Sequence, residues 1–107
     1  MSDPALEDAI RALAHPGRRA MLRLAWDEER PATELAVAAG LSRSAASQHL
    51  KLLRDAGLIT VRADATRRLY RADLDRVNQV ASFLDDFWAA PLDRLKAAAE
   101  KRRQGSS

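Results

Sequence analysis

Five polar side chains recur at helical spacing in the middle of the chain, opposite an apolar stripe. The polar residues are Arg43, Ser44, Ser47, Gln48 and Lys51, and the apolar stripe is Ala45, Ala46, Leu50, Leu53 and Ala56. Guanidinium and amide groups can form paired hydrogen bonds with guanine and adenine, whereas hydroxyl and ammonium groups suit phosphates or adaptable base contacts. No acidic residue precedes Asp55 on this face. Its chemistry therefore matches the major groove of duplex DNA.

A second group of basic residues follows in a segment with the character of a β-hairpin. The β-forming residues 58–61 and the alternating residues 67–71 flank the turn Asp64-Ala65-Thr66. Arg62, Arg67 and Arg68 gather near the tip, where a hairpin can follow the DNA backbone or insert arginine into a narrow minor groove. The alternative is that these arginines only keep the hairpin soluble.

The residues before the polar helix indicate how that helix is positioned. A short helix over about 33–39 is followed by Gly40 and by Ser42, a good N-cap for the next helix. Two helices that cross steeply through such a turn need a small residue at their close approach, here Ala36, and a glycine with positive φ. The expected motif is a helix-turn-helix whose recognition helix, over about 42–56, projects from the domain. A purely structural helix pair is the alternative.

The remaining elements are expected to be helical. Apolar periodicity predicts a first helix near residues 5–14 and a second from Pro16 to about Asp27. Asp73 caps a long C-terminal helix, which Pro91 should kink or interrupt. The fold class is therefore mainly α with a small β-hairpin, arranged as a winged helix-turn-helix.

Size and composition limit the function classes. With 107 residues, 47% hydrophobic and 31% charged, the chain suits one domain with a modest core. It has no cysteine, which excludes disulfides and thiolate chemistry. The apolar stretches are short and residues 1–7 are acidic, so we expect no membrane span, no signal peptide and a cytoplasmic location.

Charge is distributed unevenly along the chain. Residues 43–71 contain seven basic and two acidic residues, whereas residues 73–100 contain six acidic and three basic residues. A basic middle beside an acidic C-terminal helix is typical of a surface that faces a polyanion, with a separate structural region. Charges that merely solvate helix faces are the alternative.

Three segments together resemble the ArsR/SmtB family of bacterial transcriptional repressors. They are residues 12–22 (ALAHPGRRAML), 41–53 (LSRSAASQHLKLL) and 56–59 (AGLI), and the resemblance extends over about residues 5–88. It implies a homodimer built from the first and last helices, with two recognition helices one DNA turn apart on an inverted-repeat operator. It also implies repression of a promoter that often controls the repressor's own operon.

The metal ligands of sensing members of this family are missing here. Ala36 and Ala38 stand where a cysteine pair would be, and residues 73–100 contain no histidine. Asp85 and Asp86 alone are weak zinc ligands, so we expect no metal and no cofactor. We expect His15 to form a helix-terminal hydrogen bond, and His49 to be either a core residue or a phosphate contact.

The C-terminal helix carries more aromatic area than a small core accepts, which favours a subunit interface. The candidate interface residues are Leu6, Ile10, Val80, Phe83, Leu84, Phe87 and Trp88. A hydrophobic effector pocket at this helix is the alternative. We expect residues 1–107 to form a single domain, with residues 73–103 as the C-terminal dimerisation region and residues 104–107 as a disordered tail.

The sequence thus predicts a regulator that binds double-stranded DNA and is not an enzyme, because it lacks a phosphate loop, a nucleophile elbow and any catalytic histidine arrangement. The candidate DNA-binding residues are Arg43, Ser44, Ser47, Gln48, His49, Lys51, Arg62, Arg67 and Arg68. The alternative is a winged-helix module that binds another protein through its aromatic C-terminal helix. The sequence does not identify an effector.

Overall fold

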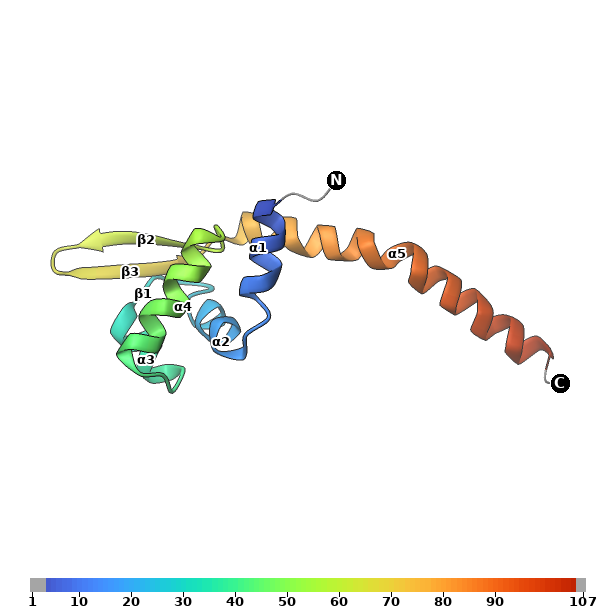
Figure 1. Ribbon diagram of the computed structural model, residues 1–107, viewed down its shortest axis with the longest axis horizontal. Coiled ribbons are helices and arrows are strands. Elements are labelled where there is room, and N and C mark those ends of the chain that lie inside the picture. The colour runs from blue at the N-terminus through green and yellow to red at the C-terminus, as the bar shows by residue number, and fades with distance from the viewer. Residues whose placement is uncertain (1–3, 106–107) are drawn as a thin grey trace.

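The computed structural model describes residues 4–105 as five helices and a small sheet, with a long C-terminal helix that leaves the domain (Figure 1). The helices are α1 (Pro4–Ala12), α2 (Pro16–Leu24), α3 (Ala32–Ala38), α4 (Arg43–Asp55) and α5 (Leu74–Gly105). The strands are β1 (Arg30–Pro31), β2 (Ile59–Asp64) and β3 (Arg67–Ala72). The predicted fold class is confirmed, although α1 and α2 end two or three residues earlier than their apolar periodicity suggests.

The sheet contains one strand more than the predicted hairpin. Its order is β1-β3-β2, and both strand pairs are antiparallel. Tyr70 of the central strand β3 lies between Arg30 of β1 and Val61 of β2. β1 comprises only two residues and lacks the alternation that marks a strand, so no sequence pattern predicts it. β1 leads directly into α3 and so ties the helix-turn-helix to the base of the wing, which is the hairpin β2-β3.

The ends of α3 and α4 follow from local residue types. Gly40 adopts φ +66°, the Leu41 amide donates to Ala36 O at 2.9 Å and the Gly40 amide donates to Val37 O at 3.1 Å. These two bonds satisfy the last carbonyls of α3 and turn the chain sharply. Ser42 Oγ then accepts from the Ala45 amide at 3.1 Å, which caps α4 as predicted.

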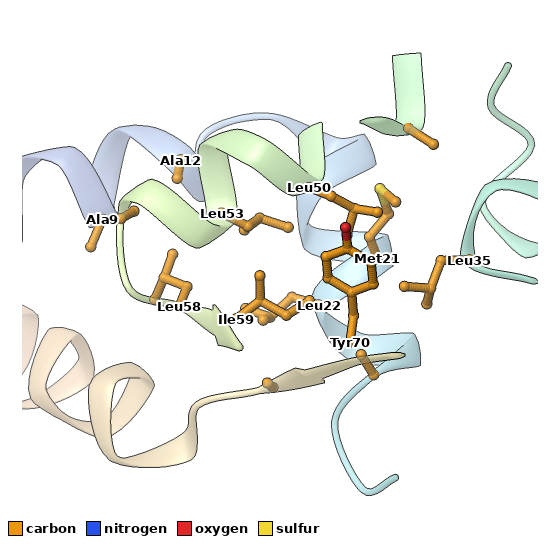
Figure 2. Packing of buried hydrophobic residues seen from close by; sticks show 14 of the residues in the cluster. Ala9, Ala12, Met21, Leu22, Leu35, Leu50, Leu53, Leu58, Ile59 and Tyr70 are labelled. Atoms are coloured by element: carbon orange, nitrogen blue, oxygen red, sulfur yellow. The ribbon is translucent and has the colours of Figure 1, made fainter. Parts of the chain in front are cut away.

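The core lies where α4 crosses α1, α2 and the sheet. Leu50 and Leu53 of α4 are buried together with Met21 of α2 and Ile59 of β2, and Figure 2 shows these side chains facing one another. The apolar stripe predicted for α4 is therefore the face that anchors this helix. The opposite face of α4 is exposed to solvent.

Pro91 was expected to kink or to interrupt α5. The helix continues through Pro91, so it is not interrupted, and Figure 1 shows it changing direction along its length. Alanine, leucine and charged residues around the proline favour helix strongly enough to continue it on both sides. Residues 104 and 105 complete α5 where a disordered tail was expected, and residues 106–107 lie outside the described residues. No helix within residues 4–105 is both long and apolar enough to span a membrane.

Candidate nucleic-acid interface

The polar face of α4 is exposed and largely free of internal partners. Arg43, Ser44, Ser47 and Gln48 are exposed, and their side chains form no hydrogen bond or ion pair with any residue of the described range 4–105. Lys51 differs, because its Nζ lies 3.2 Å from Asp55 Oδ2 one turn further along the helix. The N-terminal half of α4 thus presents donors that are available to an external acceptor.

His49 lies on a different side of α4 from these residues. Its ring is half-buried, with its centroid 4.5 Å from that of His15, and Arg18 Nη1 lies 3.3 Å from His49 Nδ1. Burial, and then the charges of His15 and Arg18, lower the pKa of His49 below its ordinary value of 6.5. The sequence pattern grouped His49 with the DNA-facing residues, whereas the structure places it against α2.

His15 has the predicted helix-terminal role. Its Nδ1 accepts a hydrogen bond from the Gly17 amide at 2.9 Å at the start of α2. Within residues 4–105 no three His, Cys, Asp or Glu side chains are grouped so that they could hold a metal ion.

The three candidate arginines of the wing differ in their partners. Arg62 Nε donates to Glu29 Oε2 at 2.9 Å, which links β2 to the loop before β1. Arg67 lies 3.3 Å from Asp64 across the turn. Arg68 is exposed and pairs with no acidic residue of the described chain. Of these three candidates, Arg68 is therefore the one whose guanidinium has no partner within residues 4–105.

Arg68 also shares a groove with the polar face of α4. This groove, of about 540 Å³, is lined by Arg43 and Ser47 of α4, Arg68 of β3 and Val37 of α3. Sequence reasoning assigned Arg43, Ser47 and Arg68 to one DNA-binding surface, and the structure brings them together. It missed the contribution of α3, in which the apolar side chain of Val37 is exposed.

The candidate interface residues fall into two groups. Phe83, Phe87 and Trp88 are exposed on α5, and the last two rings contact edge to face with centroids 5.0 Å apart. Val80 instead is buried in the core of the single chain, because the first turns of α5 still pack on the domain. Leu6, Ile10 and Leu84 are partly buried against the same core.

The exposed apolar surface of α5 also continues past the predicted residues. Leu92 and Leu95 are 55% and 66% exposed, one and two turns beyond Trp88. The prediction of an interface rested on the aromatic residues within 83–88. The exposed leucines beyond them were not included, although they recur at helical spacing.

Comparison with known proteins agrees with this geometry. Residues 13–62 match the profile of a helix-turn-helix domain family. The HTH-type transcriptional regulator YgaV of Escherichia coli (strain K12) is 39% identical over 80 residues, which cover 74% of this chain and 81% of the relative. The crystal structure of a possible transcriptional regulator for arsenical resistance is 41% identical, with a TM-score of 0.74 over 85% of this chain and 95% of that chain.

A further solved structure is the homodimeric winged helix-turn-helix DNA-binding domain of a possible ArsR-family transcriptional regulator from Mycobacterium bovis. It is 28% identical, with a TM-score of 0.66 over 78% of this chain and 84% of that domain. The chain belongs to the ArsR family of winged helix-turn-helix regulators. This ArsR-family protein is thus a transcriptional regulator whose helix-turn-helix is its DNA-binding domain, and the predicted family resemblance is confirmed.

Proposed function

We propose that this regulator is a homodimeric repressor that binds an inverted repeat in double-stranded DNA. The observation that carries the proposal is the row of exposed, internally unpaired donors on α4, beside the free guanidinium of Arg68. In this account Gln48 and Arg43 contact base edges in the major groove, and Ser44, Ser47 and Lys51 contact phosphates or adaptable base positions. The wing arginines contact the adjacent backbone or minor groove.

The dimer is proposed to form through α5 and α1. Phe83, Phe87 and Trp88 expose an aromatic surface that one chain does not cover, and such surfaces are typical of subunit interfaces. The wing and the C-terminal end of α5 lie at opposite ends of the molecule, so a dimer through α5 leaves both DNA-facing surfaces accessible (Figure 1). The Mycobacterium bovis domain is homodimeric, which supports a dimer of this chain as well.

In this proposal residues 1–107 form one domain, in which residues 73–103 supply the dimerisation helix. The protein acts in the cytoplasm, where it meets DNA, and it catalyses no reaction. Two symmetric recognition helices would then contact half-sites about one helical turn apart, roughly 10 base pairs from centre to centre.

Selection from a pool of random duplexes tests this function. We expect the enriched duplexes to share an imperfect inverted repeat with that half-site spacing, and binding to the repeat in front of a reporter promoter to lower transcription. Failure to enrich any motif would contradict sequence-specific binding. Enrichment of an isolated half-site by a protein that sediments as a monomer would contradict the symmetric dimer.

A further inference from the structure

The groove between α3, α4 and β3 has apolar walls as well as charged edges. Val37 is 81% exposed although it is apolar, and Leu41 beneath the turn of the helix-turn-helix contributes a second apolar surface. The volume of about 540 Å³ falls within the range of roughly 300–1,000 Å³ that is typical of small-molecule sites. The groove therefore offers an apolar compartment of the size of a small organic molecule.

The polar groups of the groove are all able to donate a hydrogen bond. Tyr70 forms part of its lining, and no described residue is hydrogen-bonded to the Tyr70 hydroxyl. Since no fully buried side-chain oxygen within residues 4–105 lacks a partner, this hydroxyl is not fully enclosed. Thr33 and Ser47 supply two further hydroxyl groups, and Arg43 and Arg68 supply two guanidinium groups.

No acidic residue lines this groove, so its positive charge is not compensated from within. A second hollow, of about 380 Å³ between α1, α2 and α4, differs in this respect. There Asp8 lies 3.7 Å from Arg11, and Asp55 pairs with Lys51 at 3.2 Å. The uncompensated positive charge of the first groove favours an anionic ligand, whereas the second hollow contains both acidic and basic residues.

We propose that this groove is an effector site for a small organic anion with an apolar body and a carboxylate head. The apolar body would lie against Val37 and Leu41, and the carboxylate would accept hydrogen bonds from Arg43 and Arg68. The Tyr70 hydroxyl would donate a hydrogen bond to one of the two carboxylate oxygens. This combination of apolar contact and few oriented donors is the usual basis of small-molecule specificity.

Occupation of the groove would oppose DNA binding directly. This regulatory consequence rests on the proposed function, in which Arg43 and Arg68 also contact DNA. A guanidinium that holds a carboxylate is no longer available to a base or a phosphate, so ligand and duplex would exclude each other. The effect needs no change in the fold, because both binding partners use the same two side chains.

Titration of the isotope-labelled full chain with 2-naphthoate, followed by heteronuclear NMR without DNA, tests the site. We expect amide shifts centred on Val37, Leu41, Ser47 and Tyr70, and much weaker binding of the neutral analogue 2-naphthalenemethanol. Arg68→Ala should raise the Kd for 2-naphthoate about tenfold, because it removes one charge-assisted hydrogen bond. Arg71→Ala is the matched control, because Arg71 is an exposed arginine of the same strand that does not line the groove.

The site would be overturned by no binding of 2-naphthoate, by equal shifts with the neutral analogue, or by shifts centred on the aromatic residues of α5. Equal weakening by Arg68→Ala and Arg71→Ala would do the same. A separate competition experiment tests the regulation, in which saturating 2-naphthoate should release a bound duplex. Because the NMR experiment contains no DNA, failure of the proposed DNA binding and failure of the effector site are distinguishable.

Discussion

Arg18 Nη1 donates to His49 Nδ1 over 3.3 Å, and this contact joins α2 to the helix proposed to enter DNA. The His15 ring, 4.5 Å from that of His49 between centroids, completes a small polar cluster on the inner side of α4. Arg18 is itself held by the Ala12 carbonyl, which accepts from its Nε at 2.6 Å. The cluster therefore links α4 to α1 and α2.

The first prediction concerns pH. Burial and the charges of His15 and Arg18 lower the pKa of His49, so the folded state favours the neutral imidazole. Between that lowered pKa and 6.5 the unfolded chain binds more protons, and the free energy of unfolding therefore falls as pH drops through this window. The dependence fades well above 6.5, where the imidazole is neutral in both the folded and the unfolded chain.

Urea unfolding at pH 7.5 and pH 5.5 measures this effect. His49→Gln should reduce the loss of stability between the two pH values, because glutamine does not titrate yet can still accept from Arg18. An unchanged pH dependence in the variant would show that other groups cause it.

The second prediction concerns base recognition by Gln48. Gln48→Ala should weaken binding to the preferred duplex by about 1–3 kcal/mol and leave binding to a scrambled duplex nearly unchanged, because a paired contact to adenine is lost. Fluorescence anisotropy with both duplexes measures the difference. Gln79→Ala on α5 is the control, since Gln79 is an exposed glutamine outside the proposed DNA-binding surface, where its Oε1 accepts from Arg76 Nη1 at 2.9 Å. Equal losses on both duplexes would assign Gln48 to the backbone instead.

The third prediction concerns assembly. Trp88 is half exposed on α5, and Trp88→Ala should weaken the dimer by at least about 2 kcal/mol if this ring is a central anchor. Sedimentation equilibrium measures the dissociation constant, and circular dichroism reports whether the helices are retained. Ser82→Ala on the same helix is the control. A monomer in the unsubstituted protein at micromolar concentration would exclude the proposed interface altogether.

The fourth prediction concerns the tip of the wing. Ala65 adopts φ 55°, a left-handed conformation that costs a residue with a Cβ atom about 1–2 kcal/mol. Ala65→Gly should therefore stabilise the fold by up to about 1 kcal/mol after the entropy cost of glycine. Ala63→Gly, two residues earlier in the extended strand β2, should destabilise it. Urea unfolding compares the two, and a loss of stability in both would show that Ala65 is not strained.

The features that sequence predicts well here are local ones. Gly40 ends α3 and Ser42 caps α4 through bonds that span only a few residues, so residue type and spacing suffice to place them. The polar face of α4 is likewise visible in the periodicity of one helix.

The features that sequence did not predict depend on contacts between distant residues. Arg62 pairs with Glu29, 33 positions earlier, and so differs from Arg68 although both are wing arginines. Val80 and Phe83 share the apolar stripe of α5, but periodicity does not reveal at which turn the helix leaves its own core. The groove beside Val37 likewise forms only when α3, α4 and β3 are brought together.

The most direct test of the account compares the affinity of the protein for its selected duplex with its affinity for a scrambled duplex of equal length, across a series of salt concentrations. We predict that the selected duplex binds at least roughly 10³-fold more tightly. We also predict that both affinities fall steeply with salt, as counterions are released from the phosphates. Equal affinity for the two duplexes at every salt concentration would contradict the claim that α4 reads base sequence.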